Sequence, residues 1–120
     1  MEGPIYKKTI EFSINLISLY KELLRNSEYI ISKQLMRSGT SIGANVQEAT
    51  SAQSRRDFIN KISIAAKEAK ETRYWLIILS ECNVVSYDYS KLLYEIEEII
   101  KILSKIILTA KNNLNTKLKN

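Results

Sequence analysis

The stretch Ser54–Cys82, SRRDFINKISIAAKEAKETRYWLIILSEC, decides the fold. Its apolar and small residues recur at alternating steps of four and three, at Phe58, Ile62, Ala65, Ala69, Thr72, Leu76 and Leu79. Such steps keep side chains on one face of an α-helix, which is typical of a helix-bundle seam. Ser54 and Asp57 form an N-cap pair, and Asn83 suits the left-handed position after a helix. The pattern therefore predicts a helix over residues 55–82.

The same spacing continues on both sides of this stretch. Three further amphipathic segments cover residues 5–24, 28–51 and 87–112, with Ser86 as the expected N-cap of the last one. Residues 113–120 form a short basic tail that we expect to be flexible. Because the links between the segments are short, residues 1–120 are predicted to form a single all-α domain, an antiparallel up-down-up-down four-helix bundle.

Composition excludes several classes of protein. The 120 residues include no His, a single Cys (Cys82) and only three Gly and one Pro. A chain without His lacks the commonest general base and metal ligand, and one Cys permits neither an internal disulfide nor a zinc cluster. No apolar run reaches the ~18 residues of a membrane helix. We expect a cytoplasmic protein that is not an enzyme and has no cofactor, no metal and no membrane contact.

The first segment is apolar on two nearly opposite sides. Ile10, Ile14, Ile17 and Leu24 lie on one side, and Phe12, Leu16, Leu19 and Leu23 on the other. A helix of a monomeric bundle needs one buried face, so the second face predicts packing on another copy of the chain. The alternative is a thicker monomer core. The candidate residues for the oligomer interface are Phe12, Leu16, Leu19, Leu23, Ile64, Trp75 and Ile78.

The excess positive charge lies near the C-terminus. Residues 101–120 contain five lysines and no acid, whereas acids and bases balance in the preceding 100 residues. Lysines favour a helix C-terminus and solubility, and they could also contact phosphates. The candidate nucleic-acid contacts are Arg55, Arg56, Lys101, Lys105, Lys111, Lys117 and Lys119.

Small residues and carboxylates in the middle of the chain predict helix packing. Gly39 and Gly43 are four residues apart, so a neighbouring helix could approach closely there. Glu48, Glu68 and Glu71 lie near apolar positions, and ion pairs with Arg37, Arg55, Arg56 or Arg73 are the simplest use for them. A dinuclear metal site is the alternative, but it normally requires His ligands and recurring Glu motifs.

Two blocks resemble a known family. SGTSIGANVQEA (Ser38–Ala49) and SRRDFINKISIAAKEAKETRYWL (Ser54–Leu76) resemble the bacterial 23S rRNA intervening-sequence proteins, also called S23 ribosomal-protein-like. More distantly, the chain is similar to the accessory variability proteins of diversity-generating retroelements. The resemblance implies a bundle that assembles as a homopentamer, and it gives only a structural role to the motif residues. These include Gly39, Asn45, Glu48, Glu68 and Glu71. Arg37 and Gly43 are expected to have a structural role too, in ion pairing and in helix packing.

Two functions are consistent with these features. The first is a homo-oligomeric scaffold or adaptor, indicated by the surplus of apolar helix faces. The second is an RNA-binding accessory protein, in which oligomerisation would multiply a modest basic patch. In both cases the chain would bind further copies of itself. The RNA-binding function would add RNA or a nucleic-acid-processing protein as a partner.

Overall fold

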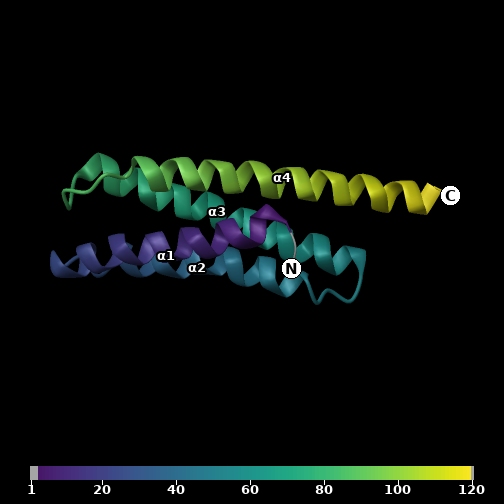
Figure 1. The fold of residues 1–120 in the computed structure, drawn as a ribbon, viewed down its shortest axis with the longest axis horizontal. Helices are drawn as coiled ribbons and strands as arrows, with labels where there is room; N and C mark the ends of the chain where they lie inside the picture. The colour runs from purple at the N-terminus through teal and green to yellow at the C-terminus, as the bar shows by residue number, and fades with distance from the viewer. Residues whose placement is uncertain (1–2, 120) are drawn as a thin grey trace.

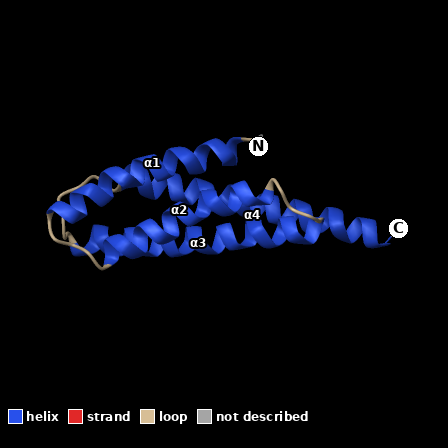
Figure 2. Cartoon of the chain, turned by 90° about the horizontal axis from the view of Figure 1, so that it is seen from below, coloured by secondary structure: helices blue, strands red, loops and turns tan. Residues whose placement is uncertain are grey.

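The computed structural model describes residues 3–119, with side chains placed as far as residue 116. It contains four helices, α1 (Pro4–Arg25), α2 (Ile31–Ala49), α3 (Arg55–Cys82) and α4 (Ser90–Lys119), and no strand in that part of the chain. The predicted all-α four-helix bundle is confirmed (Figures 1 and 2).

Each helix packs against its neighbours in the chain, and α1 also packs against α4. α1 and α3 are therefore diagonally opposed, as are α2 and α4. The bundle measures 57 × 22 × 22 Å. Figure 1 shows the α1–α2 and α3–α4 links at one end and the α2–α3 link at the other, where α4 continues past the start of α1.

Local hydrogen bonds determine where the helices begin and end. The Ser54 hydroxyl accepts from the Asp57 amide at 3.0 Å, and Asn83 ends α3 with φ of 53°, so both predicted caps are confirmed. α2 begins at Ile31, later than predicted, because the Glu28 carboxylate accepts from the amides of Ile30, Ile31 and Ser32. Glu28 thus satisfies amides that the first helical turn leaves unpaired.

The predicted start of the fourth helix at residue 87, capped by Ser86, is wrong. α4 begins at Ser90, whose amide donates to the Asp88 carboxylate at 3.1 Å. The end predicted at residue 112 is also too early, because α4 continues to Lys119 through the tail that we expected to be flexible. Two features explain the longer helix. Leu114 of α4 lines one groove together with Ile59 of α3, and the lysines near the end of α4 interact favourably with the helix dipole.

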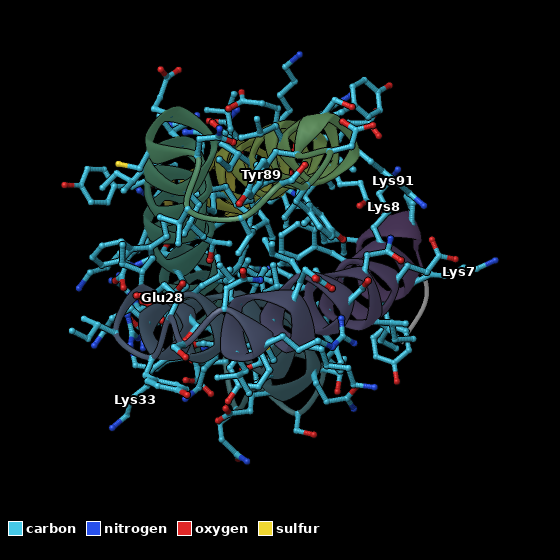
Figure 3. All side chains as sticks on the ribbon, turned by 90° about the vertical axis from the view of Figure 1, so that its left-hand side faces the viewer. Lys7, Lys8, Glu28, Lys33, Tyr89 and Lys91 are labelled. Atoms are coloured by element: carbon cyan, nitrogen blue, oxygen red, sulfur yellow. The ribbon has the colours of Figure 1, made fainter. Side chains whose placement is uncertain are left out.

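The core is aliphatic along the length of the bundle. At the end shown in Figure 3, Val85 and Tyr89 from the α3–α4 link close it, and the Tyr89 ring packs edge-on against Tyr87. The largest fully buried side chains come from all four helices: Phe12, Leu16, Leu19, Leu23, Leu35, Ile42, Ile62, Leu76, Leu79, Ile96, Ile99 and Leu103.

Two glycines let α1 approach α2 closely. A Cβ at Gly39 would overlap Cδ2 of Leu16, and one at Gly43 would lie 3.3 Å from Cβ of Thr9. Leu16 therefore occupies the space that a side chain at position 39 would need. The small-residue strip in α2 acts as a packing surface for α1.

Replacing Gly39 by Val tests this contact. Valine is the better helix former, so propensity alone would stabilise the protein. We expect Gly39→Val instead to lower the free energy of unfolding by about 1–3 kcal/mol, because overpacking at Leu16 outweighs that gain. Urea denaturation followed by circular dichroism measures the change.

Lys33→Val, on an exposed position of α2, is the control and should change stability by less than about 0.5 kcal/mol. Equal effects of the two substitutions would contradict a specific contact between Gly39 and Leu16.

Candidate functional site

The structure separates the two apolar sides of α1. Phe12, Leu16, Leu19 and Leu23 are fully buried in the core of the single chain. Their assignment to an oligomer interface is wrong, because they are packed inside the bundle and have no surface left for a partner. The other side carries Ile10, Ile14 and Ile17, which are 45%, 61% and 40% exposed.

This exposed side of α1 borders a groove against α2, which we call the α1–α2 face. The groove encloses about 300 Å³, and no charged residue of the described part of the chain lines it. Ile10, Ile14 and Ile17 repeat at steps of four and three, so they form one continuous apolar stripe along the helix. The lining residues are Tyr6, Thr9, Ile10, Ser13, Ile14, Ile17, Thr40, Gly43, Ala44 and Gln47.

The remaining interface candidates lie on a second surface. Ile64 is exposed, whereas Trp75 and Ile78 are half-buried, and all three follow one stripe of α3. The Trp75 indole donates to Glu71 at 3.1 Å, and Glu71 also accepts from Arg37 of α2. This stripe, the α2–α3 face, thus lies on the side of the bundle next to the α1–α2 face.

Arg37 joins α2 to α3. Its guanidinium donates to the Glu68 carboxylate at 2.8 Å and to Glu71 through a second nitrogen. Hydrogen bonds from the Trp75 indole and from Arg37 lower the pKa of Glu71 from its usual value of 4.5. Next to this cluster, the buried Thr72 hydroxyl donates to Ser38 Oγ at 2.9 Å. Together these contacts fix the register of the two helices.

The other motif residues have local structural roles. Glu48 pairs with Lys61 across 3.5 Å, and Arg73 pairs with Glu97 of α4 across 2.9 Å. The Asn45 amide donates to the carbonyl and the hydroxyl of Ser41, one turn earlier in α2. None of these contacts brings carboxylates together, and the described residues contain no cluster of His, Cys, Asp or Glu that could hold a metal ion.

The antiparallel packing of α3 and α4 gathers the predicted basic residues at one end of the bundle. Arg55 and Lys105 line one groove, and Arg56 and Lys111 line another. Lys101 is exposed one turn before Lys105. The side chains of Lys117 and Lys119 lie outside the described residues. None of the ion pairs in the described part of the chain includes Arg55, Arg56, Lys101, Lys105 or Lys111, and we call this region the basic end.

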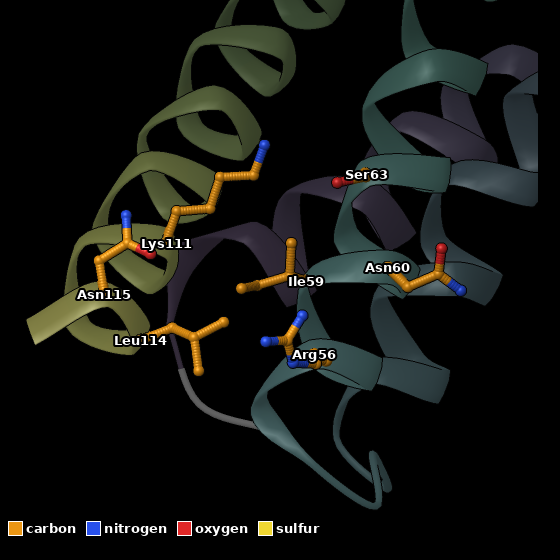
Figure 4. A pocket seen from close by; sticks show the side chains of 7 residues that line it. All are labelled: Arg56, Ile59, Asn60, Ser63, Lys111, Leu114 and Asn115. Carbon is orange, nitrogen blue, oxygen red and sulfur yellow. The ribbon is translucent and has the colours of Figure 1, made fainter. Parts of the chain in front are cut away.

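The two grooves of the basic end differ in character. The outer groove, of about 430 Å³, lies between α3 and α4, with Arg56 beside Ile59 and Leu114 (Figure 4). The inner groove, of about 520 Å³, faces the interior of the bundle and is mostly apolar. Its lining residues are Pro4, Arg55, Phe58, Ile102, Lys105, Ile106, Thr109, Ala110 and Asn113. Sequence spacing could not reveal it, because it arises where α1 begins.

None of the described helices is long and apolar enough to cross a membrane.

Comparison with known proteins identifies a family and similar solved structures. Residues 2–105 match the family model described as 23S rRNA-intervening sequence protein. A crystal structure of a protein of unknown function from the S23 ribosomal protein family of Bacteroides thetaiotaomicron superposes with a TM-score of 0.83 at 46% identity, covering 87% of this chain and 98% of that one. Among curated proteins, none matches the sequence. The family resemblance seen in residues 38–76 is thereby confirmed.

The Glu71 cluster predicts a specific pH dependence. A carboxyl group whose pKa falls on folding stabilises the protein above its unfolded value of 4.5, and this contribution is lost as the pH falls below that value. We expect Glu71→Gln to lower the thermal unfolding midpoint at pH 7 and to have a smaller effect at pH 3. Calorimetry at both pH values measures the difference.

Glu81→Gln makes the same change on an exposed turn of α3 and controls for the loss of one negative charge. An effect of Glu71→Gln that is equal at the two pH values would contradict the role of these hydrogen bonds.

Proposed function

The chain belongs to the 23S rRNA-intervening sequence protein family, and from this premise we propose that it is a non-enzymatic scaffold that works as a homo-oligomer. The observation that carries the proposal is the α1–α2 face. It combines three exposed isoleucines with a groove that no charged side chain lines.

Desolvation is inexpensive on the α1–α2 face. Covering Ile10, Ile14 and Ile17 removes apolar surface from water without stripping water from a charge. The small residues Gly43 and Ala44 of α2 leave room for side chains of a partner in the groove. A contiguous apolar surface with these properties is typical of a protein–protein contact.

A second surface, which carries apolar residues beside the Arg37–Glu71 pair, supports a ring rather than a two-fold dimer. The α2–α3 face, with Ile64 and Trp75, lies on the adjacent side of the bundle. A contact that joins one face of each copy to a different face of the next is heterologous, and it closes into a ring if the rotation permits. The family resemblance favours five copies. Such a ring would hold several copies of the basic end at a fixed spacing. A scaffold protein presents its binding surfaces in this way.

Replacing Ile14 by Asp tests the α1–α2 face. Ile14 is 61% exposed, so the substitution should leave the fold of each chain intact, yet it places a charge in the centre of the contact. We expect sedimentation velocity at micromolar concentration to show an assembly for the native chain and a folded monomer for Ile14→Asp.

Two matched variants separate assembly from folding. Ile77 of α3 is 45% exposed and belongs to neither face, so Ile77→Asp should preserve the assembly. Leu16→Asp should instead reduce helix content, because Leu16 is fully buried. A native chain that is monomeric at this concentration, or an unchanged assembly of Ile14→Asp, would contradict the proposal.

A further inference from the structure

The inner groove exists because α1 begins short of this end of the bundle, where α3 begins and α4 ends. Gly3 has φ of 100°, a conformation that few residues other than glycine adopt, and Pro4 is the first residue of α1. α3 and α4 continue beyond this level, and Figures 1 and 2 show α4 extending well past the start of α1. The fourth position of the bundle is therefore not occupied by α1 at this end.

The floor of the inner groove continues the apolar core. Phe58, Ile102 and Ile106 are half-buried and pack against the core cluster, and Ala110 is buried. The groove follows α4 from Ile102 to Asn113, which corresponds to about 17 Å, or three helical turns. An apolar strip of this length on the inner faces of two packed helices has the shape that a third helix fills.

We propose that the inner groove binds an acidic amphipathic helix of a partner protein, which lies in line with α1 and completes the bundle at this end. The proposal does not depend on self-association, because the inner groove shares no lining residue with the α1–α2 face.

The positive charge of the inner groove indicates that the partner helix is negatively charged. Arg55 from α3 and Lys105 from α4 line the groove, and Lys101 lies one turn away. Among the residues that the structure describes, no acidic side chain lines the groove. The nearest carboxylate in the sequence of α3, that of Asp57, accepts from the Gln53 amide at 3.1 Å as part of the helix cap. A helix with glutamates beside its apolar stripe would place them against Arg55 and Lys105 while its apolar residues cover Phe58 and Ile106.

Two other occupants fit the groove less well. A nucleic acid would gain from Arg55 and Lys105, but its hydrated phosphates would lie on the mostly apolar floor of the groove. A second copy of α4 brings a helix whose residues 101–116 carry lysines and no acid, so it would be repelled. The acidic helix satisfies both the charge and the apolar floor.

A synthetic peptide tests the proposal. The probe is a fluorescein-labelled helix of about 14 residues, or roughly four turns, with leucines on one face and glutamates on both flanks. A scrambled peptide of the same composition and a single-stranded uridine-rich RNA are the comparison ligands. Fluorescence anisotropy is measured with the full chain, and sedimentation velocity reports its oligomeric state.

Three variants locate the contact. Arg55→Glu combined with Lys105→Glu reverses the charge of the groove, and Thr109→Glu adds an acid at an exposed position that lines it. Lys33→Glu combined with Lys91→Glu makes the same charge change at the opposite end of the bundle (Figure 3). Circular dichroism checks that each variant folds. If the Arg55→Glu/Lys105→Glu variant does not fold, Thr109→Glu alone tests the groove.

We expect saturable binding of the amphipathic peptide, with at least tenfold weaker binding of the scrambled peptide. Arg55→Glu/Lys105→Glu and Thr109→Glu should each weaken binding about tenfold, whereas Lys33→Glu/Lys91→Glu should not. Equal binding of the two peptides would overturn the proposal. So would RNA binding that is tighter than peptide binding and lost on Arg55→Glu/Lys105→Glu, or a change of oligomeric state in that variant.

Discussion

The close contact between Leu16 and Gly39 is the constraint on which the rest of the structure depends. It determines how α1 is rotated on α2, because only the side of α1 that carries Leu16 meets a helix surface without a side chain. Once Leu16 lies over Gly39, Phe12, Leu19 and Leu23 also point inward and are fully buried. Ile14 and its neighbours on the opposite side are left at the surface. A packing choice in the core therefore creates the surface that we propose for assembly.

α2 connects this constraint to α3 through polar contacts. On its α1 side it presents glycines, and on its α3 side it presents Ser38 and Arg37, which bind Thr72, Glu68 and Glu71. Polar contacts of this kind contribute less to stability than apolar packing, but the pairs of Arg37 with Glu68 and Glu71 form only in this register. α2 thus combines close approach on one side with a defined register on the other, which leaves little freedom in how three helices are arranged.

The sequence predicts those features that local patterns determine. α3 runs from residue 55 to 82 as predicted, because Ser54 and Asn83 mark its ends. The start of α2 differs from the prediction, because the cap is supplied by the side chain of Glu28 three residues earlier in the chain. In α4, Asp88 rather than Ser86 supplies the local acceptor. Several side chains that could accept a hydrogen bond from the first helical amides lie close together in these links. The sequence alone does not show which of them caps the helix.

Contacts between helices limit what can be predicted about the site. Both sides of α1 are apolar with the same period, so the packing of α1 on its neighbours, including Leu16 over Gly39, decides which side is buried. Arg55 and Lys105 are distant in sequence and meet because α3 and α4 are antiparallel. The inner groove depends on where α1 begins relative to α4. These features depend on how the helices are aligned with one another. The apolar periodicity of a single helix does not predict that alignment.

The central claim is that the isoleucines turned outward by the Leu16–Gly39 contact lie between copies of the chain. The most direct measurement is an isotope-filtered methyl NOE experiment on a mixture of isoleucine-methyl-labelled chains and unlabelled chains. We predict NOEs between chains for the methyl groups of Ile10, Ile14 and Ile17, and none for the buried Ile42 and Ile62. NOEs confined to the chain itself for all five isoleucines would contradict the account.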